Sequence, residues 1–213
     1  MMQTLRLPDQ KSDALQKSQT WSLLTPALVP QARELIQASE GNLLVIVHPF
    51  FFEGWLRSET IEQSMDSYLR MLSRRPHKEF SVPDAVEYYH NYTERLMATI
   101  NRSNERAVIV FEGPHSIENT MRNLIASDRK DRNWFVVPFD NASCLVNARP
   151  LLAPLEVGQL RICGSVLSLD NNSNLARPGT CVNEVALCFE PVVRSVVPVV
   201  EGSFVGFDSL RVS

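Results

Sequence analysis

The stretch that decides the fold is Leu43–Val47, an unbroken run of leucine, valine and isoleucine that stops at His48. Further runs of the same kind stop as abruptly at polar or small residues: Ala107–Phe111 at Glu112, Trp134–Val137 before Asp140, Leu160–Cys163 at Gly164, and Ser195–Val200 at Glu201. Continuous apolar runs of this length are typical of strands whose two faces are both covered by helices, as in a parallel sheet. The runs therefore predict an α/β fold.

Helical periodicity fills the segments between these runs. Apolar residues recur at helical spacing over 32–38, 58–72, 86–100, 117–125 and 182–189, and two prolines break a further helix expected over 145–157. Strand alternating with helix indicates right-handed βαβ crossovers. We expect a three-layer αβα sandwich with a mainly parallel sheet of five or six strands.

Length and composition restrict the domain organisation and the partners. The 213 residues fit a partly loose N-terminal arm over 1–29 and a single α/β domain over 30–213. A net charge of -3 without a basic stripe argues against nucleic acid as a partner. No apolar stretch approaches the roughly 20 residues of a membrane span, and the first residues lack the apolar core of a secretion signal. These features predict a cytoplasmic protein without membrane association.

The cysteines show no spacing typical of a zinc site or a redox motif. Cys144, Cys163, Cys181 and Cys188 each lie in or beside an apolar segment. Buried free thiols in a reducing compartment are the simplest interpretation. We expect no metal and no cofactor, because the glycine-rich phosphate-binding motifs are also missing from the sequence.

The predicted fold also indicates where a site would lie. Ligands of open parallel sheets bind beyond the carboxyl ends of the strands. Polar residues that follow the predicted strands gather there: His48, Glu112, His115, Asp140 and Asn141. A small-molecule site is therefore expected at this edge.

The helix expected after the fourth apolar run begins near Thr180 and Cys181. A cysteine at a helix amino terminus meets unpaired backbone N–H groups and the positive end of the helix dipole, and both favour the thiolate. Cys181 is thus the nucleophile candidate with a physical reason for reactivity. Packing beside Val182 and Val185 is the competing interpretation.

Two segments resemble a known family. Ile162-Cys163-Gly164 and the helix start Gly179–Ala186, with its Cys181-Val182 pair, resemble the isochorismatase-like cysteine hydrolases. Asn141–Cys144 and the apolar run at Leu43 resemble other parts of that family's pattern. The resemblance covers about residues 42–203 and implies hydrolysis of an amide-type bond in a small molecule through a Cys181 thioester.

The chain departs from the family pattern at two positions. That family places an aspartate at the end of its first strand and a lysine at the end of its third, where this chain has Val47 and Pro138. Neither side chain transfers a proton. His48 is the candidate replacement base because an imidazole can accept a proton near neutral pH, and Asp140 is a second candidate. Alternation along a strand predicts, however, that His48 faces the opposite side of the sheet from Val47.

Other rim residues have both a binding and a structural interpretation. Phe52, Glu112, His115, Asn141 and Thr180 are the candidate ligand-binding residues. The segment 112–115 loosely resembles a metal site of some nicotinamide-hydrolysing relatives, but a solvated Glu112 and a helix cap at Ser116 explain it better. Asp140 and Asn141 equally suit an Asx turn.

Two hypotheses of different kinds follow. One is a cysteine hydrolase with Cys181, His48 and Asp140 as its catalytic residues. The other is a binding or scaffold protein that keeps the fold without the chemistry. Its aromatic segment Phe50–Trp55 would mediate association, for example between copies of the chain in a homo-oligomer. A third possibility is that the resemblance is accidental and that this edge binds a nucleotide or another small molecule, for which the sequence offers no glycine-rich phosphate loop.

Overall fold

A parallel six-stranded sheet forms the centre of the protein. The computed structural model describes residues 21–50, 82–128, 130, 132–140, 142–169, 175 and 180–205. The strand order is β1-β4-β3-β2-β5-β6, and every neighbouring pair is parallel. The predicted α/β class with a mainly parallel sheet is confirmed.

All of the apolar runs quoted above are strands. They are β2 (Asn42–Val47), β3 (Ala107–Glu112), β4 (Asn133–Pro138), β5 (Gln159–Leu167) and β6 (Ser195–Val205). A short edge strand that was not predicted, β1 (Trp21–Leu23), pairs with β4. It extends the sheet into the segment that was expected to be an arm.

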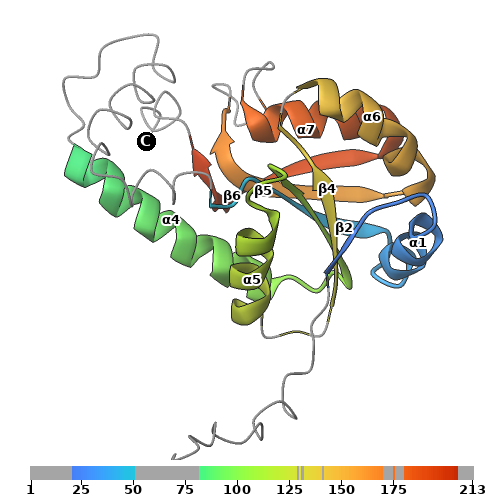
Figure 1. Ribbon diagram of the computed structural model, residues 1–213, viewed down its shortest axis with the longest axis horizontal. Helices are drawn as coiled ribbons and strands as arrows, with labels where there is room; N and C mark the ends of the chain where they lie inside the picture. Colours follow the sequence, from blue (N-terminus) through green and yellow to red (C-terminus); the bar gives the residue numbers. More distant parts are fainter. Residues whose placement is uncertain are drawn as a thin grey trace, which may run out of the picture.

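Helices pack on both faces of the sheet (Figure 1). On one face lie α1 (Val29–Gln37), α6 (Ala142–Leu152) and α7 (Cys181–Phe189). On the other lie α4 (Val82–Arg102) and α5 (Ile117–Ser127). Short 3-10 turns, η1 (Ala153–Leu155) and η2 (Glu190–Val192), follow α6 and α7. Because helices cover both faces of the sheet, the side chains that alternate between the two faces along β3 are all buried.

Strand β2 illustrates this division of the core. Leu43, Val45 and Val47 pack with α1 and α7, whereas Leu44 and Ile46 pack with α4 and α5. All of these side chains are fully buried. The two clusters of apolar side chains account for the continuous apolar runs in the sequence.

Several expectations lie outside the described residues. These are the helix over 58–72, most of the aromatic segment with the candidate Phe52, most of the loop before Thr180, and the candidate Asn141. Among the helices that the structure describes, none is long and apolar enough to cross a bilayer.

Candidate functional site

Strands β2 and β5 are neighbours in the sheet, and the chain continues from them towards opposite edges of the sheet. From β2 the chain continues through α4 to β3, and from β5 it continues through α7 to β6 on the other side. Since α4 and α7 cover opposite faces, the chain leaves the two adjacent strands in opposite directions. This is the topological switch point at which open α/β sheets bind ligands.

The residue that follows β2, His48, forms a buried pair with the last residue of β3. Its Nδ1 lies 3.0 Å from Glu112 Oε1, and the two residues are 7% and 4% exposed. The backbone N–H of His48 donates to the carbonyl of Phe111 at 2.9 Å. The pair thus joins the ends of two neighbouring strands.

Glu112 is not the solvated strand end that the sequence predicted. Its Oε1 also accepts the backbone N–H of Gly113 at 2.8 Å, and its Oε2 accepts the hydroxyl of Thr120 at 2.9 Å. These donors replace water, so the carboxylate can be buried. Sequence reasoning missed Thr120, because only the packing of α5 brings it to the end of β3.

The backbone of His48 also corrects an expectation. Its φ of 44° is left-handed, and this conformation interrupts the alternation of side chains along β2. The imidazole ring lies 5.0 Å from the ring of Phe139, which belongs to the same core cluster as Val47. Position 48 therefore does not simply turn to the opposite face.

Strand β5 is also irregular at this end. Gly164 has a φ of 133° and Val166 a φ of 63°. A positive φ is uncommon for a β-branched residue and is maintained only by the surrounding structure. A Cβ atom on Gly164 would lie 2.0 Å from the carbonyl oxygen of Val47, so the contact between β2 and β5 requires glycine.

Cys181 is the first residue of α7 and is only partly buried. Burial raises the pKa of its thiol, and the charges of Glu184 and Glu112 raise it further, while the backbone N–H of Cys181 acts in the opposite direction. The start of a helix is therefore not sufficient to stabilise a thiolate here. A base must remove the proton for this sulfur to act as a nucleophile.

A fully buried amide holds the start of α7 in place. Asn183 Nδ2 donates to the carbonyl of Ser168 at 2.8 Å, and its Oδ1 accepts the backbone N–H of Ser168 at 3.1 Å. The same oxygen accepts the hydroxyl of Thr180 at 2.8 Å. Thr180 thus has a structural partner, and the helix carrying Cys181 is anchored to the segment that follows β5.

The remaining candidates are less constrained. Asp140 is exposed, and its Oδ1 lies 3.3 Å from where a Cβ on Gly113 would stand. His115 is exposed between β3 and α5, and Ser116 occupies the cap position of α5 without a capping hydrogen bond from its side chain. Among the described residues, no group of three His, Cys, Asp or Glu side chains could hold a metal ion.

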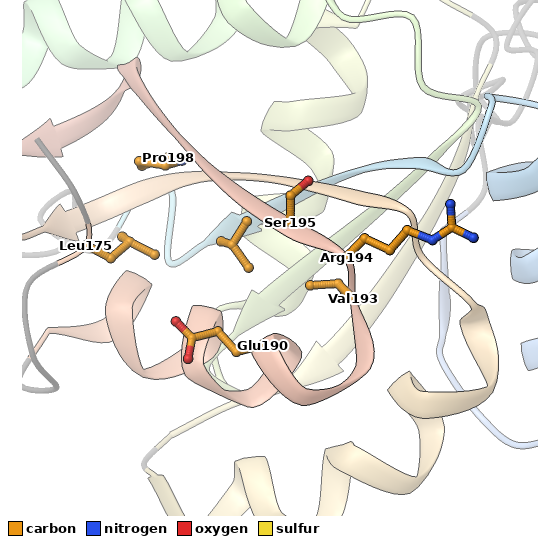
Figure 2. Close-up of a pocket in the computed structure, with 7 residues that line it drawn as sticks. Leu175, Glu190, Val193, Arg194, Ser195 and Pro198 are labelled. Carbon is orange, nitrogen blue, oxygen red and sulfur yellow. The ribbon is translucent and has the colours of Figure 1, made fainter.

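One described pocket lies elsewhere, between η2 and the first residues of β6 (Figure 2). It has a volume of about 300 Å³, and its lining includes Leu175, Glu190, Arg194 and Pro198. None of the predicted site residues lines it. The candidate site at the carboxyl end of the sheet rests instead on the pair of His48 and Glu112 beside the topological switch point.

Comparison with known proteins adds no relative: no protein-family model, no curated protein and no solved structure matches the chain. The likeness to the isochorismatase-like hydrolases thus stays a prediction that rests on its short motifs. The fold, the buried pair of His48 and Glu112, and the place of Cys181 at the start of α7 are the observations from which a function can be argued.

Proposed function

We propose that the carboxyl end of the sheet hydrolyses an amide-type bond in a small molecule, with Cys181 as nucleophile and His48 as base. The observation that carries this proposal is the buried pair of His48 and Glu112 beside the topological switch point. The charge of Glu112 is near enough to Cys181 to raise the pKa of the thiol.

The pair supplies the group that the thiol needs. When Glu112 accepts a hydrogen bond from His48 Nδ1, the lone pair of the ring is on Nε2. A carboxylate that orients a histidine in this way recurs in catalytic triads. His48 would thus replace the aspartate that the family resemblance expects at the position of Val47.

The reaction has two stages. His48 accepts the thiol proton as the Cys181 sulfur attacks the carbonyl carbon, and the same proton then passes to the departing amine, leaving a thioester. Water, deprotonated by His48, attacks the thioester, releases the acid and returns the proton to the sulfur. The first backbone N–H groups of α7 have no acceptor within the helix and can bind the oxyanion.

The reactivity of Cys181 tests the role of His48. We expect His48→Asn to lower the rate of Cys181 alkylation by iodoacetamide at pH 7 by about tenfold or more, because the base is lost. Peptide mass spectrometry measures the rate, with Cys188 as the internal reference. His90→Asn, on the exposed side of α4, is the matched control and should leave the rate unchanged.

A covalent adduct tests the chemistry directly. Incubation with a panel of small amides and activated esters, followed by intact-mass measurement, should give an acyl adduct on the wild-type chain and none on Cys181→Ala. Equal alkylation of Cys181 and Cys188, together with no acyl adduct, would exclude the hydrolase.

A second candidate function is a non-catalytic binding or scaffold protein with the same fold. It is favoured by the raised pKa of Cys181 and by the absence of ionisable side chains at Val47 and Pro138. In that case Cys181→Ala retains the biological role and the binding of partners or ligands.

A further inference from the structure

Thr120 uses its hydroxyl in an unusual way for a residue inside a helix. Its backbone N–H donates to the carbonyl of Ser116 at 2.9 Å, as α5 requires. Threonine hydroxyls in helices often bond a carbonyl one turn earlier. This hydroxyl instead leaves the helix and donates to Glu112 Oε2 at 2.9 Å, with Thr120 only 2% exposed.

The three donors to Glu112 do not constrain it equally. Gly113 is the next residue in the chain, so its N–H binds Oε1 locally. Thr120 belongs to a separate helix and binds the other oxygen. A carboxylate held at both oxygens from different elements has one orientation, and that orientation places Oε1 3.0 Å from His48 Nδ1.

We infer that Thr120 is a positioning residue, which holds Glu112 so that its carboxylate selects the Nδ1–H form of His48. Outer partners of this kind fix both the tautomer and the orientation of a histidine ring. The inference rests on the proposed function only where it extends to Cys181. The link from Thr120 through Glu112 to His48 stands on the geometry alone.

A purely structural role would look different. If Thr120 only satisfied a buried oxygen, its removal would lower stability without changing the state of the His48 ring. The deciding measurement is therefore the tautomer of His48. Nitrogen-15 NMR of histidine-labelled protein reports it directly.

We expect Thr120→Val to reduce the Nδ1–H form of His48 and Thr120→Ser to retain it, because serine keeps the hydroxyl. Wild-type spectra in both variants would overturn the inference, whatever happens to stability. If the valine variant does not fold, Thr120→Cys replaces it in the test, because the thiol keeps a weak hydrogen-bond donor at this position. The cysteine variant should show a population of the Nδ1–H form between those of the wild type and the valine variant. A population equal to that of the wild type counts against the proposal.

Alkylation of Cys181 then separates this inference from the proposed function. If both hold, Thr120→Val also lowers the rate at pH 7 by about tenfold, and Thr120→Ser restores it. A changed tautomer with an unchanged rate supports the role of Thr120 and contradicts His48 as the base for Cys181. In Glu112→Gln, adding Thr120→Val should change neither readout further, because the positioning runs through the carboxylate.

Discussion

The two ends of the sheet each hold a buried pair of oppositely chargeable side chains, and the two pairs are built differently. Beyond the amino ends, Arg132 Nε lies 3.0 Å from Asp128 Oδ2, and the two side chains are 1% and 0% exposed. Beyond the carboxyl ends, His48 Nδ1 lies 3.0 Å from Glu112 Oε1. The two pairs are alike in the distance between their partners and in their burial, so they differ mainly in the chemistry of the side chains.

The pair at the amino end is fixed by hydrogen bonds to residues at the end of α4 and just after it. Arg132 Nη1 donates to the hydroxyl of Ser103 at 2.7 Å, and Nη2 donates to the carbonyl of Ile100 at 3.1 Å. Lys130 also donates to the carbonyl of Ser103. Burial lowers the pKa of Arg132, but the carboxylates of Asp128 and Glu105 act against this. A guanidinium stays protonated in a protein, so this network only connects neighbouring turns.

The pair at the carboxyl end contains a group that can gain and lose a proton. His48 lies at a backbone position with positive φ, and the neighbouring β5 has two more such positions, at Gly164 and Val166. Strained backbone and a titratable pair at a switch point are typical of functional sites. The two pairs thus differ in the property that the proposed function needs, because only the pair at the carboxyl end contains an imidazole, which can serve as a base.

The largest expected effect is at the contact between β2 and β5. Gly164→Ala should destabilise the protein by at least about 4 kcal/mol, because the new Cβ would overlap the Val47 carbonyl and φ is 133°. Urea unfolding followed by circular dichroism measures the loss. Gly158→Ala is the control, since its Cβ would lie 3.4 Å from the Gly41 oxygen. Similar stability for the two variants would show that β5 is not strained here.

The pair at the amino end should have the next largest effect. Asp128→Asn should lower the free energy of unfolding by about 3 kcal/mol, because it removes the negative charge that lies in contact with the buried guanidinium. Asp140→Asn, at an exposed carboxylate of the other end, should change it by less than about 0.5 kcal/mol. Equal losses in thermal unfolding would refute the structural role assigned to the network.

A thiol just before the strained part of β5 gives an intermediate effect that depends on pH. Burial raises the pKa of Cys163 from 9.0 to about 12. The folded chain then keeps a proton that the unfolded chain loses, so stability is full below pH 9 and falls as the pH rises towards 12. At pH 10 the loss should be about 1.4 kcal/mol relative to pH 8.

Urea unfolding of the wild type and of Cys163→Ala at both pH values isolates this contribution. Other titrating groups change stability equally in the two proteins. The alanine variant should therefore lose less stability between pH 8 and pH 10 than the wild type does. The same loss in both would mean that the Cys163 thiol is not shielded from water.

The smallest effect is expected for an exposed ion pair. Arg33 and Glu156 pair with side chains that are 46% and 55% exposed. Arg33→Ala should therefore cost less than about 1 kcal/mol, measured by the same unfolding experiment at low salt. A loss as large as that of Asp128→Asn would show that burial does not separate the two kinds of pair.

The strands could be predicted because each buries both faces in one continuous apolar run. β1 was missed, since Trp21–Leu23 is only three residues long and two of them are exposed. The sequence predicted that β5 and β6 end several residues before the positions at which the structure ends them. Small or polar residues such as Gly164 and Glu201 interrupt the apolar runs there, although pairing continues past them to Leu167 and Val205.

For the candidate site, the sequence indicated which residues follow the strands. Parallel strands bring their carboxyl ends to one edge, so His48 and Glu112 were expected at that edge. Their pairing, the burial of Glu112 and the contribution of Thr120 were not predictable. Each depends on the positive φ of His48 or on how α5 packs against the sheet.

The sequence by itself determined the segments that are buried and the polar residues that end them, because hydrophobic periodicity reports the surroundings of each residue locally. Only the tertiary structure decided the strand order and the partner of each buried polar group. His48 and Glu112 are 64 positions apart. Whether two such groups meet within hydrogen-bond distance depends on strand order and backbone direction, which no local pattern encodes.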